Sequence, residues 1–347
     1  EYQQAVSSTN TQDILANAGL QYNLAKGLSF SANYQYQRQI KLTETLQDIN
    51  SFAARDLINR FTQINRSTGL VKYPVPLGGI FNNTKAIIET QNARGQISYQ
   101  KNWGKHDLSL LAGGEIREIV STGSTSRVYG YNDEYVTVGV VDLVNTYPTF
   151  ITGANQAIPS GNAFSGKRNR CTSLFFNGSY TYRSKYMFSA SARKDASNLF
   201  GVQANEKGVP LWSSGLSWTL SKEPFYSLSW LPILKLRLTY GSSGNVDNNR
   251  SAVTTIGYTP IGSQYTNLPY ANVTQFPNPS LRWEKVYVFN AGIDFATKSS
   301  LLSGSIEYYT KKGVDLFGNA PVDYTTGLGT NYLTENIANM EGHGFDI

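Results

Sequence analysis

The stretch LRWEKVYVFNAGIDFATKSSLLSGSIEYYTKKGVDLF, residues 281–317, decides the fold. Its first arm alternates apolar side chains with small or polar ones, as a β-strand with two different faces does. One face carries Tyr287, Phe289, Ala291, Ile293 and Phe295, and the other carries Asn290, Gly292 and Asp294. After a turn at 298–300 the chain returns with the same alternation. Both arms exceed the usual five or six residues of a soluble strand. The stretch therefore predicts a long antiparallel hairpin of the kind that separates lipid from water.

The composition agrees with a β-rich chain. There are 23 Tyr, 16 Phe and 31 Gly among 347 residues, and only 16% of the residues are charged. Tyr and Phe favour pleated surfaces, and Tyr also suits the boundary between a bilayer and water. No run of about 18 apolar residues occurs, so a membrane-spanning helix is excluded. A soluble β-sandwich uses the same residue types, and composition alone leaves both classes open.

Residues for catalysis or metal binding are sparse. Cys171 is the single cysteine, and His106 and His343 lie far apart in the chain. The segment GNAFSGKR at 161–168 departs from a phosphate-binding loop at Arg168, and no zinc or calcium motif is complete. The net charge of +6 is mild. We expect no enzyme activity, no catalytic residue, no metal, no cofactor and no nucleic-acid partner.

The alternation recurs along the chain. Residues 14–37 show it most clearly, with a turn at Lys26 and Gly27 and mainly uncharged amides and hydroxyls on the polar face. Residues 84–101 and 107–129 predict a second hairpin, and residues 174–240 predict a meander of four strands. With the hairpin at 281–317 and the end of the chain, about eleven strands are expected.

Two long segments interrupt the strands, at about 43–83 and 131–169. In the first, Phe52, Leu57, Phe61 and Ile64 approach helical spacing, which predicts a short helix over 51–64. Its apolar face is expected to pack on neighbouring loops. The second segment is rich in Gly, Asn, Pro and Tyr, which is typical of irregular structure.

Long and short connections segregate by side if the strands alternate up and down. One side would hold the connections near 24–27, 102–106, 183–185, 222–233 and 298–300, of which all but the fourth are tight. The other side would hold those near 43–83, 131–169, 201–209, 245–280 and 319–334. Outer-membrane barrels have short periplasmic turns and long extracellular loops, whereas a sandwich needs no such separation. The pattern favours a transmembrane antiparallel up-and-down β-barrel.

Several blocks of the sequence also resemble one family. They are LFFNGSYTYRSKYMFSASARKDASNLFG (174–201), WSSGLSWTLSKEPF (212–225), LKLRLTYGSSGN (234–245), NPSLRWEKVYVFNAGIDF (278–295), LLSGSIEYYTKKGVDLF (301–317) and NIANMEGHGFDI (336–347). In this order they look like the SusC/RagA family, which are TonB-dependent outer-membrane transporters of Bacteroidetes. Residues 1–170 fit more loosely, although ARDLINRFTQIN (54–65) and YPVPLGGIF (73–81) look like a loop of that family.

The resemblance implies a barrel of about 22 strands filled by an amino-terminal plug. Residues 1–347 would then be part of the β-barrel domain, and we expect the plug and the TonB box to precede Glu1. The implied function is nutrient import across the bacterial outer membrane, for oligosaccharides or peptides. The implied partners are a SusD-like lipoprotein, the TonB–ExbB–ExbD complex acting through the plug, and outer-membrane lipid and lipopolysaccharide.

Two groups of residues are candidates for contact with cargo. Aromatic side chains in the long connections, able to stack on a sugar or peptide or to meet a partner, are Tyr129, Tyr131, Tyr135, Tyr147, Tyr265 and Tyr270. Polar side chains that parity places toward a lumen are Glu115, Arg117, Arg193, Arg237, Asp294 and Glu307. Packing within the loops, or pairing of the acids with Arg117, Arg193 or Arg237, explains the same residues without any cargo.

Other functions remain open at this stage. The same barrel could be a passive pore or a subunit of a secretion assembly, which a TonB box upstream would argue against. An outer-membrane enzyme would need an acid or Ser beside a His in the loops. A soluble carbohydrate-binding β-sandwich would be extractable without detergent.

Overall fold

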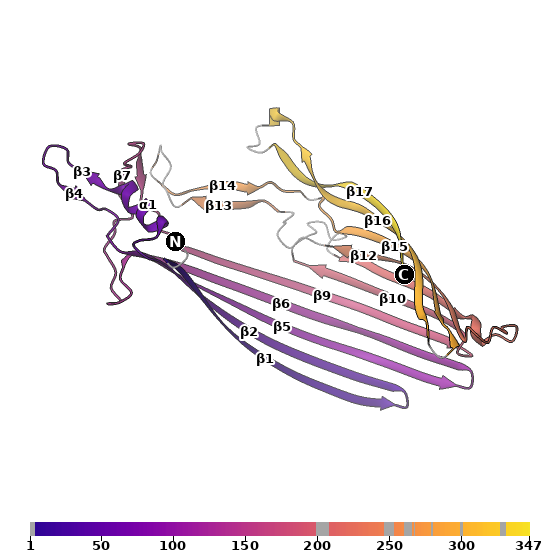
Figure 1. Cartoon of the computed structure of the whole chain (residues 1–347). Helices are drawn as coiled ribbons and strands as arrows, with labels where there is room; N and C mark the ends of the chain where they lie inside the picture. Colours follow the sequence, from indigo (N-terminus) through magenta and orange to yellow (C-terminus); the bar gives the residue numbers. More distant parts are fainter. Residues whose placement is uncertain are drawn as a thin grey trace. The chain divides into compact units, whose positions relative to one another are not determined.

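Eleven strands of the computed structural model form one sheet, in the order in which they follow along the chain (Figure 1). The structure describes residues 4–198, 208–245, 253–259, 266, 268–278, 280–298, 301–326 and 331–347. The strands are β1 (Ala5–Ala25), β2 (Leu28–Gln47), β5 (Gly79–Trp103), β6 (His106–Tyr131), β9 (Ala163–Tyr182), β10 (Tyr186–Ser197), β11 (Gly208–Thr219), β12 (Ile233–Asn245), β15 (Glu284–Ala296), β16 (Ser303–Pro321) and β17 (Tyr332–Asp346). The predicted number of strands is confirmed, and a single sheet in chain order is not a sandwich.

Alternate connections fall into a short set and a long set, as predicted, with the fourth member of the short set, 220–232, again the exception because it is longer than 198–207 or 322–331. The short ones are 26–27, 104–105, 183–185, 220–232 and 297–302, and the third contains Arg183 and Ser184 with positive φ. The long ones are 48–78, 132–162, 198–207, 246–283 and 322–331. Because neighbouring strands are antiparallel, alternate connections lie at opposite ends of the strands. Residues 299 and 300 of the predicted 298–300 turn lie outside the described residues.

The chain divides into two compact units. Unit 1 comprises residues 1–17, 35–91 and 118–168, and unit 2 comprises residues 18–34, 92–117 and 169–347. Strands β1, β2, β5, β6 and β9 contribute residues to both units. All five short connections belong to unit 2.

Helix α1 (Phe52–Phe61) and two small hairpins belong to the long connections of unit 1. The hairpins are β3 (Gln63–Ile64) with β4 (Val71–Lys72) and β7 (Thr146–Pro148) with β8 (Asn155–Ala157). The Ser51 hydroxyl caps the helix by accepting a hydrogen bond from the Ala54 N–H, at 3.2 Å. None of the helices among the described residues is long and apolar enough to span a membrane.

The described part of the remaining connections is also locally ordered. A third hairpin pairs β13 (Thr255–Thr259) with β14 (Tyr270–Gln275), and single 3₁₀ turns lie at Leu220–Lys222 and Tyr324–Thr326. The predicted helix boundary at residue 64 is wrong, because the chain becomes extended at Thr62 and then enters β3. Strands β2, β5 and β9 extend further into the predicted irregular segments than the side-chain pattern indicated, since backbone pairing does not need alternation.

The strands of unit 2 have one apolar and one polar face. Cross-strand neighbours on the apolar face form the row Tyr182, Tyr186, Trp218, Leu236, Ile293 and Ile306. The next residue of each strand forms the row Thr181, Met187, Ser217, Arg237, Gly292 and Glu307 on the polar face. The register of the strands therefore places the alternating apolar residues of all six strands on one face of the sheet and the residues between them on the other.

Candidate functional site

An arginine on the polar face of unit 2 holds two acids from two other strands. Arg237 of β12 donates from Nε and Nη2 to the two carboxylate oxygens of Asp294 on β15, each at 2.8 Å. It also forms an ion pair with Glu307 of β16. The second oxygen of Glu307 accepts a 2.8 Å hydrogen bond from Asn290 Nδ2. The cluster is thus fully paired and holds one cation against two carboxylates.

A second polar cluster gathers around Phe175 of β9. The Arg94 guanidinium lies over the Phe175 ring, 4.4 Å from its centroid, and 3.9 Å from Glu115. Arg193 is the cross-strand partner of Phe175 and donates to Asp195 at 2.6 Å and to Ser173 Oγ at 2.9 Å. Two cations and two acids balance in this cluster, and the half-buried Phe175 ring lies under the Arg94 guanidinium.

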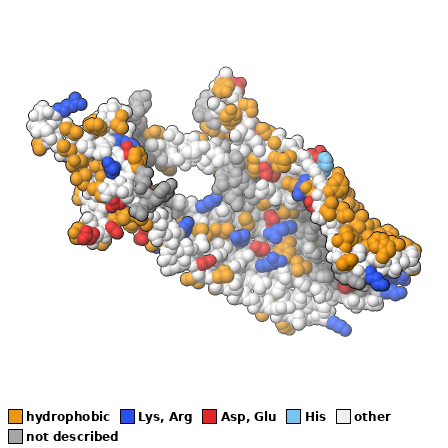
Figure 2. Space-filling view, in the orientation of Figure 1, with side chains coloured by type: hydrophobic (Ala, Val, Ile, Leu, Met, Phe, Trp, Pro, Cys, Tyr) orange, Lys and Arg blue, Asp and Glu red, His pale blue; other side chains and the backbone are white. Residues whose placement is uncertain are grey.

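These contacts locate the predicted polar residues. The sequence predicted that Asp294 and Glu307 pair with arginine, and Arg237 is that partner. Glu115 instead pairs with Arg94, which the parity argument did not single out, because Arg94 lies on a different strand and only the register brings it close. Arg117 is exposed on β6. Figure 2 shows side chains of both charges together in the middle of the visible surface.

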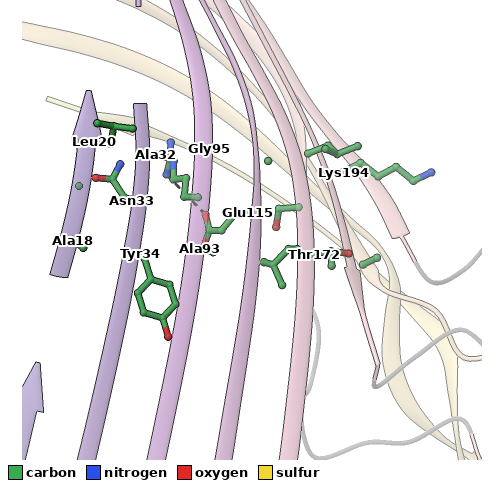
Figure 3. Close-up of a pocket in the computed structure, with 17 residues that line it drawn as sticks. Ala18, Leu20, Ala32, Asn33, Tyr34, Ala93, Gly95, Glu115, Thr172 and Lys194 are labelled. Carbon is green, nitrogen blue, oxygen red and sulfur yellow. Dashed lines mark ion pairs between the residues drawn. The ribbon is translucent and has the colours of Figure 1, made fainter. Parts of the chain in front are cut away.

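Small and apolar side chains line a cavity of about 1000 Å³ in unit 2 (Figure 3). The cavity exists because the side chains at four lining positions are small or absent: Ala18, Ala32, Ala93 and Gly95. It is flanked by Leu20 and Tyr34. Figure 3 also shows the ion pair between Arg94 and Glu115 as a dashed line, and Lys194 pointing away from the strands. Among the described residues no group of three His, Cys, Asp or Glu side chains gathers as a metal site would require.

The long connections of unit 1 form a small module with its own core. The core consists of Ala54, Ile58, Phe61, Val75, Ile80, Tyr129 and Ile158. Gln63 ties two segments together, because its Nε2 donates to the carbonyls of Phe61 and Pro148, both at 2.8 Å. The module therefore presents a defined surface rather than separate loose loops.

Asp142 fixes the turn that leads into β7. Its carboxylate accepts hydrogen bonds from Asn145 Nδ2 at 2.6 Å, from the N–H groups of Val144 and Asn145, and from the Tyr147 hydroxyl at 2.9 Å. These hydrogen bonds hold the pKa of Asp142 well below its usual range, and the bond from the Asn145 side chain has the largest effect. The hydrogen bond from the Tyr147 hydroxyl to Asp142 raises the pKa of Tyr147.

The predicted loop aromatics have different surroundings. Tyr129 is only 1% exposed and its hydroxyl donates to the Pro159 carbonyl, so it belongs to the core of the module and has no surface to offer cargo. Tyr147 is half-buried on Asp142, and Tyr131 stacks on Phe81 with ring centroids 4.8 Å apart. Tyr135 and Tyr270 are 69% and 42% exposed. Tyr265 lies outside the described residues.

Sequence reasoning missed an apolar surface beside helix α1. Phe52, Phe150 and Ile151 line a cavity of about 520 Å³ together with Arg55 and Arg60, and Phe52 is 70% exposed. The spacing predicts Phe52 on the helix face that packs on loops, but the buried residues of α1 are Ala54, Ile58 and Phe61. The available signal was that Phe52 is the first residue after the cap, where the helix has not yet turned toward the core.

Known proteins are similar to this chain in sequence and in fold. A family model described as "TonB dependent receptor-like, beta-barrel" matches residues 2–347. TonB-dependent receptor P3 of Formosa agariphila is 28% identical over 298 residues, which are 83% of this chain and 28% of the relative. TonB-dependent receptor SusC of Bacteroides thetaiotaomicron is 29% identical over 266 residues, 72% of this chain and 24% of the relative.

A solved structure of the RagAB peptide importer superposes with a TM-score of 0.77 at 19% identity, covering 99% of this chain and 34% of that chain. This likeness extends the agreement in fold to nearly every residue. The chain spans about a quarter of the length of the curated relatives it matches. Since the family model covers almost the entire sequence, the chain belongs to the TonB dependent receptor-like, beta-barrel family.

Proposed function

We propose that this chain forms part of the wall and the extracellular loops of a SusC-like importer that takes up oligosaccharides or peptides through the outer membrane. The observation that carries the proposal is the eleven-stranded sheet in chain order, with the tight turns 26–27, 104–105, 183–185 and 297–302 all at one end of the strands. In this family arrangement the short end is periplasmic and the long connections are extracellular. The relatives are receptors, and the chain is proposed to make or break no bond.

The apolar face would contact lipid, and the polar face would line the lumen. Because acids and arginines on the polar face neutralise one another, the electrostatic potential in the lumen would be weak. A weak potential suits uncharged or zwitterionic cargo better than a polyanion. The half-buried Phe175 ring offers apolar surface to a sugar ring, and the nearby Arg94 and Arg193 offer hydrogen-bond donors to a peptide carboxylate. Both cargo classes fit this chemistry.

The module of unit 1 would meet a SusD-like surface lipoprotein. Its exposed Phe52, Phe150 and Ile151 form the kind of apolar patch that marks an interaction surface. Import would further require a plug and the TonB–ExbB–ExbD complex. Support for these partners comes from the SusC relative and from the fold shared with the RagAB importer.

The first test is the intact mass of the full-length protein after detergent extraction from outer membranes, with co-purifying chains identified. A mass of about three times this chain's 38.3 kDa, with a lipoprotein attached, is expected. A detergent-independent monomer of 38.3 kDa would contradict the proposal. Uptake that persists after removal of TonB would instead indicate a passive pore.

Cargo class is tested by binding panels of oligosaccharides and peptides to the same preparation. Replacing the exposed Tyr135 and Tyr270 by Ala is expected to weaken binding by about two- to tenfold, the range of one aromatic contact. Tyr22→Ala, on β1 outside the loops and 62% exposed, is the matched control and should leave binding unchanged. Equal loss in the control would show that the loop tyrosines do not contact cargo.

A further inference from the structure

Positive charge is concentrated in the five short connections. They contain six Lys or Arg residues and a single acid, Glu223; the cations are Lys26, Lys105, Arg183, Lys185, Lys222 and Lys298. The five long connections contain seven Lys or Arg against eight Asp or Glu. Almost all of the chain's net charge of +6 therefore lies at the short-connection end. Figure 2 shows Lys and Arg side chains at this end of the strands, at the lower right.

Two cations at this end rest on aromatic rings. Lys101 Nζ lies 5.5 Å from the centroid of the Trp103 ring, and Arg183 Cζ lies 5.2 Å from that of Tyr182. His106 connects the two rings, because it stacks on Trp103 at 5.3 Å and lies 5.0 Å from Tyr182. Aromatic rings beside cations are typical of the level at which lipid headgroups lie.

The backbone fixes two of these turns against each other. The Arg183 N–H donates to the Lys105 carbonyl at 2.6 Å, so the β5–β6 and β9–β10 turns stay together. Lys105 and Arg183 line a polar cavity of about 380 Å³ with Asp107. Two cations against one carboxylate leave this cavity positive.

The acid of the short connections pairs with Lys185 and leaves Lys105 and Arg183 without a carboxylate from these connections. Glu223 is 8% exposed and is paired with Lys185 at 3.0 Å. It also accepts hydrogen bonds from the Tyr186 hydroxyl at 2.6 Å and from Trp218 Nε1 at 3.0 Å. The negative charge of Glu223 is therefore bound by Lys185, Tyr186 and Trp218.

An apolar groove begins at the same aromatic side chains. A cavity of about 1020 Å³ is lined by Tyr182, Tyr186, Trp218, Phe188, Leu216 and Leu236 of the apolar face. Positive charge at one end and an apolar groove beside it match a molecule with a phosphate headgroup and hydrocarbon chains. A soluble anion would use the cations but would leave the aromatic rings and the groove in water.

We propose that the short-connection end of unit 2 binds anionic phospholipid, with the headgroup phosphate at Lys101, Lys105 and Arg183 and the acyl chains along the apolar face. The proposal concerns the membrane leaflet at that end and is independent of the cargo. Each Lys or Arg near an anionic surface is expected to contribute about fivefold to affinity.

The test uses the full-length protein in detergent, titrated with phosphatidylglycerol or with phosphatidylcholine and followed by native mass spectrometry. The variant Lys101→Gln/Lys105→Gln/Arg183→Gln removes the proposed headgroup contacts. The control Arg55→Gln/Arg66→Gln/Lys72→Gln removes the same charge from the long connections. A third variant, Lys101→Arg/Lys105→Arg/Arg183→Lys, keeps the charge and reports on folding.

Wild type should bind phosphatidylglycerol more tightly than phosphatidylcholine, and the affinity of the first variant for phosphatidylglycerol should fall by on the order of a hundredfold. The control and the charge-preserving variant should stay within about threefold of wild type. If the first variant does not fold, raising salt from about 0.05 to about 0.5 M should abolish the preference of wild type. Equal binding of phosphatidylcholine, equal loss in the control, loss in the charge-preserving variant, or displacement of lipid by inorganic phosphate would each overturn the proposal.

Discussion

Arg237 of β12 and Glu307 of β16 form an ion pair across the strand that lies between them. The residue of β15 in register with both is Gly292. A Cβ atom at Gly292 would lie 3.3 Å from Glu307 Cγ and 3.4 Å from Arg237 Nη2. The missing side chain therefore leaves the space in which the two charged groups meet, and the pairing depends on a glycine as much as on the charges.

Gly292→Val should separate this ion pair. Branched carbon atoms would occupy the space between the guanidinium and the carboxylate, and crowding of this kind is expected to lower the thermal unfolding midpoint of the full-length protein by on the order of 1 °C. Gly342→Val on β17 is the matched control, because a Cβ there meets nothing within 4 Å. Equal midpoints for the two variants, measured in detergent, would show that the space at Gly292 is not needed.

Glu223 should make the short-connection end sensitive to acid. Hydrogen bonds from Tyr186, then Trp218 and Lys185, lower the pKa of Glu223 from 4.5 to about 2. A carboxyl group whose pKa is lower in the folded state stabilises the fold fully above the unfolded pKa. That stabilisation is lost as the pH falls from about 4.5 to about 2.

The measurement is the unfolding midpoint of the full-length protein between pH 6 and pH 2, for wild type and for Glu223→Gln. The difference between the two should be constant above pH 5 and should shrink below pH 4.5. Tyr186→Phe removes the largest cause of the shift and should move the loss to higher pH. A difference that does not change with pH would mean that the ionised carboxylate is not what stabilises the cluster.

Replacing Phe61 and Phe52, two residues of the same type on helix α1, should have different effects on the stability of the module. Phe61 is 1% exposed in the module core and Phe52 is 70% exposed. Phe61→Ala is expected to cost the module about 3–5 kcal/mol of local unfolding free energy, whereas Phe52→Ala should stay within about 0.5 kcal/mol. Hydrogen exchange of the α1 amides in the full-length protein measures both. Similar exchange rates in the two variants would mean that the module is not held by this core.

The strands could be predicted well from the sequence because a sheet with one apolar and one polar face requires the two kinds of side chain to alternate along every strand. The row through Arg237 and Glu307 has the parity that alternation assigns to it, and the separation of short and long connections follows from strand order alone. Strand ends were less predictable, as β2 runs to Gln47 and β5 starts at Gly79. The alternation fades there, whereas backbone pairing continues.

The site residues were harder to predict, since burial and partners depend on segments far apart in the chain. Tyr129 packs with Ile58 and Ile158, and nothing near Tyr129 in the sequence marks it as a core residue. Glu115 pairs with Arg94 of the neighbouring strand, a contact that only the register specifies. Local pattern thus predicted which face a side chain lies on, and the register decided which partner it meets.

Asp142 should control how easily the 132–162 connection is cut by protease. Asp142→Ala removes the acceptor of four hydrogen bonds at once, so the segment should be cleaved several-fold faster in the full-length protein. Tyr147→Phe removes one of the four and should have a smaller effect. Because the pKa of Asp142 is lowered by these bonds, wild type should keep its protection below the ordinary titration range of an aspartate and lose it only in stronger acid. Cleavage of wild type that already accelerates near pH 4, at the rate of the Ala variant, would show that the hydrogen-bonded carboxylate does not hold this turn.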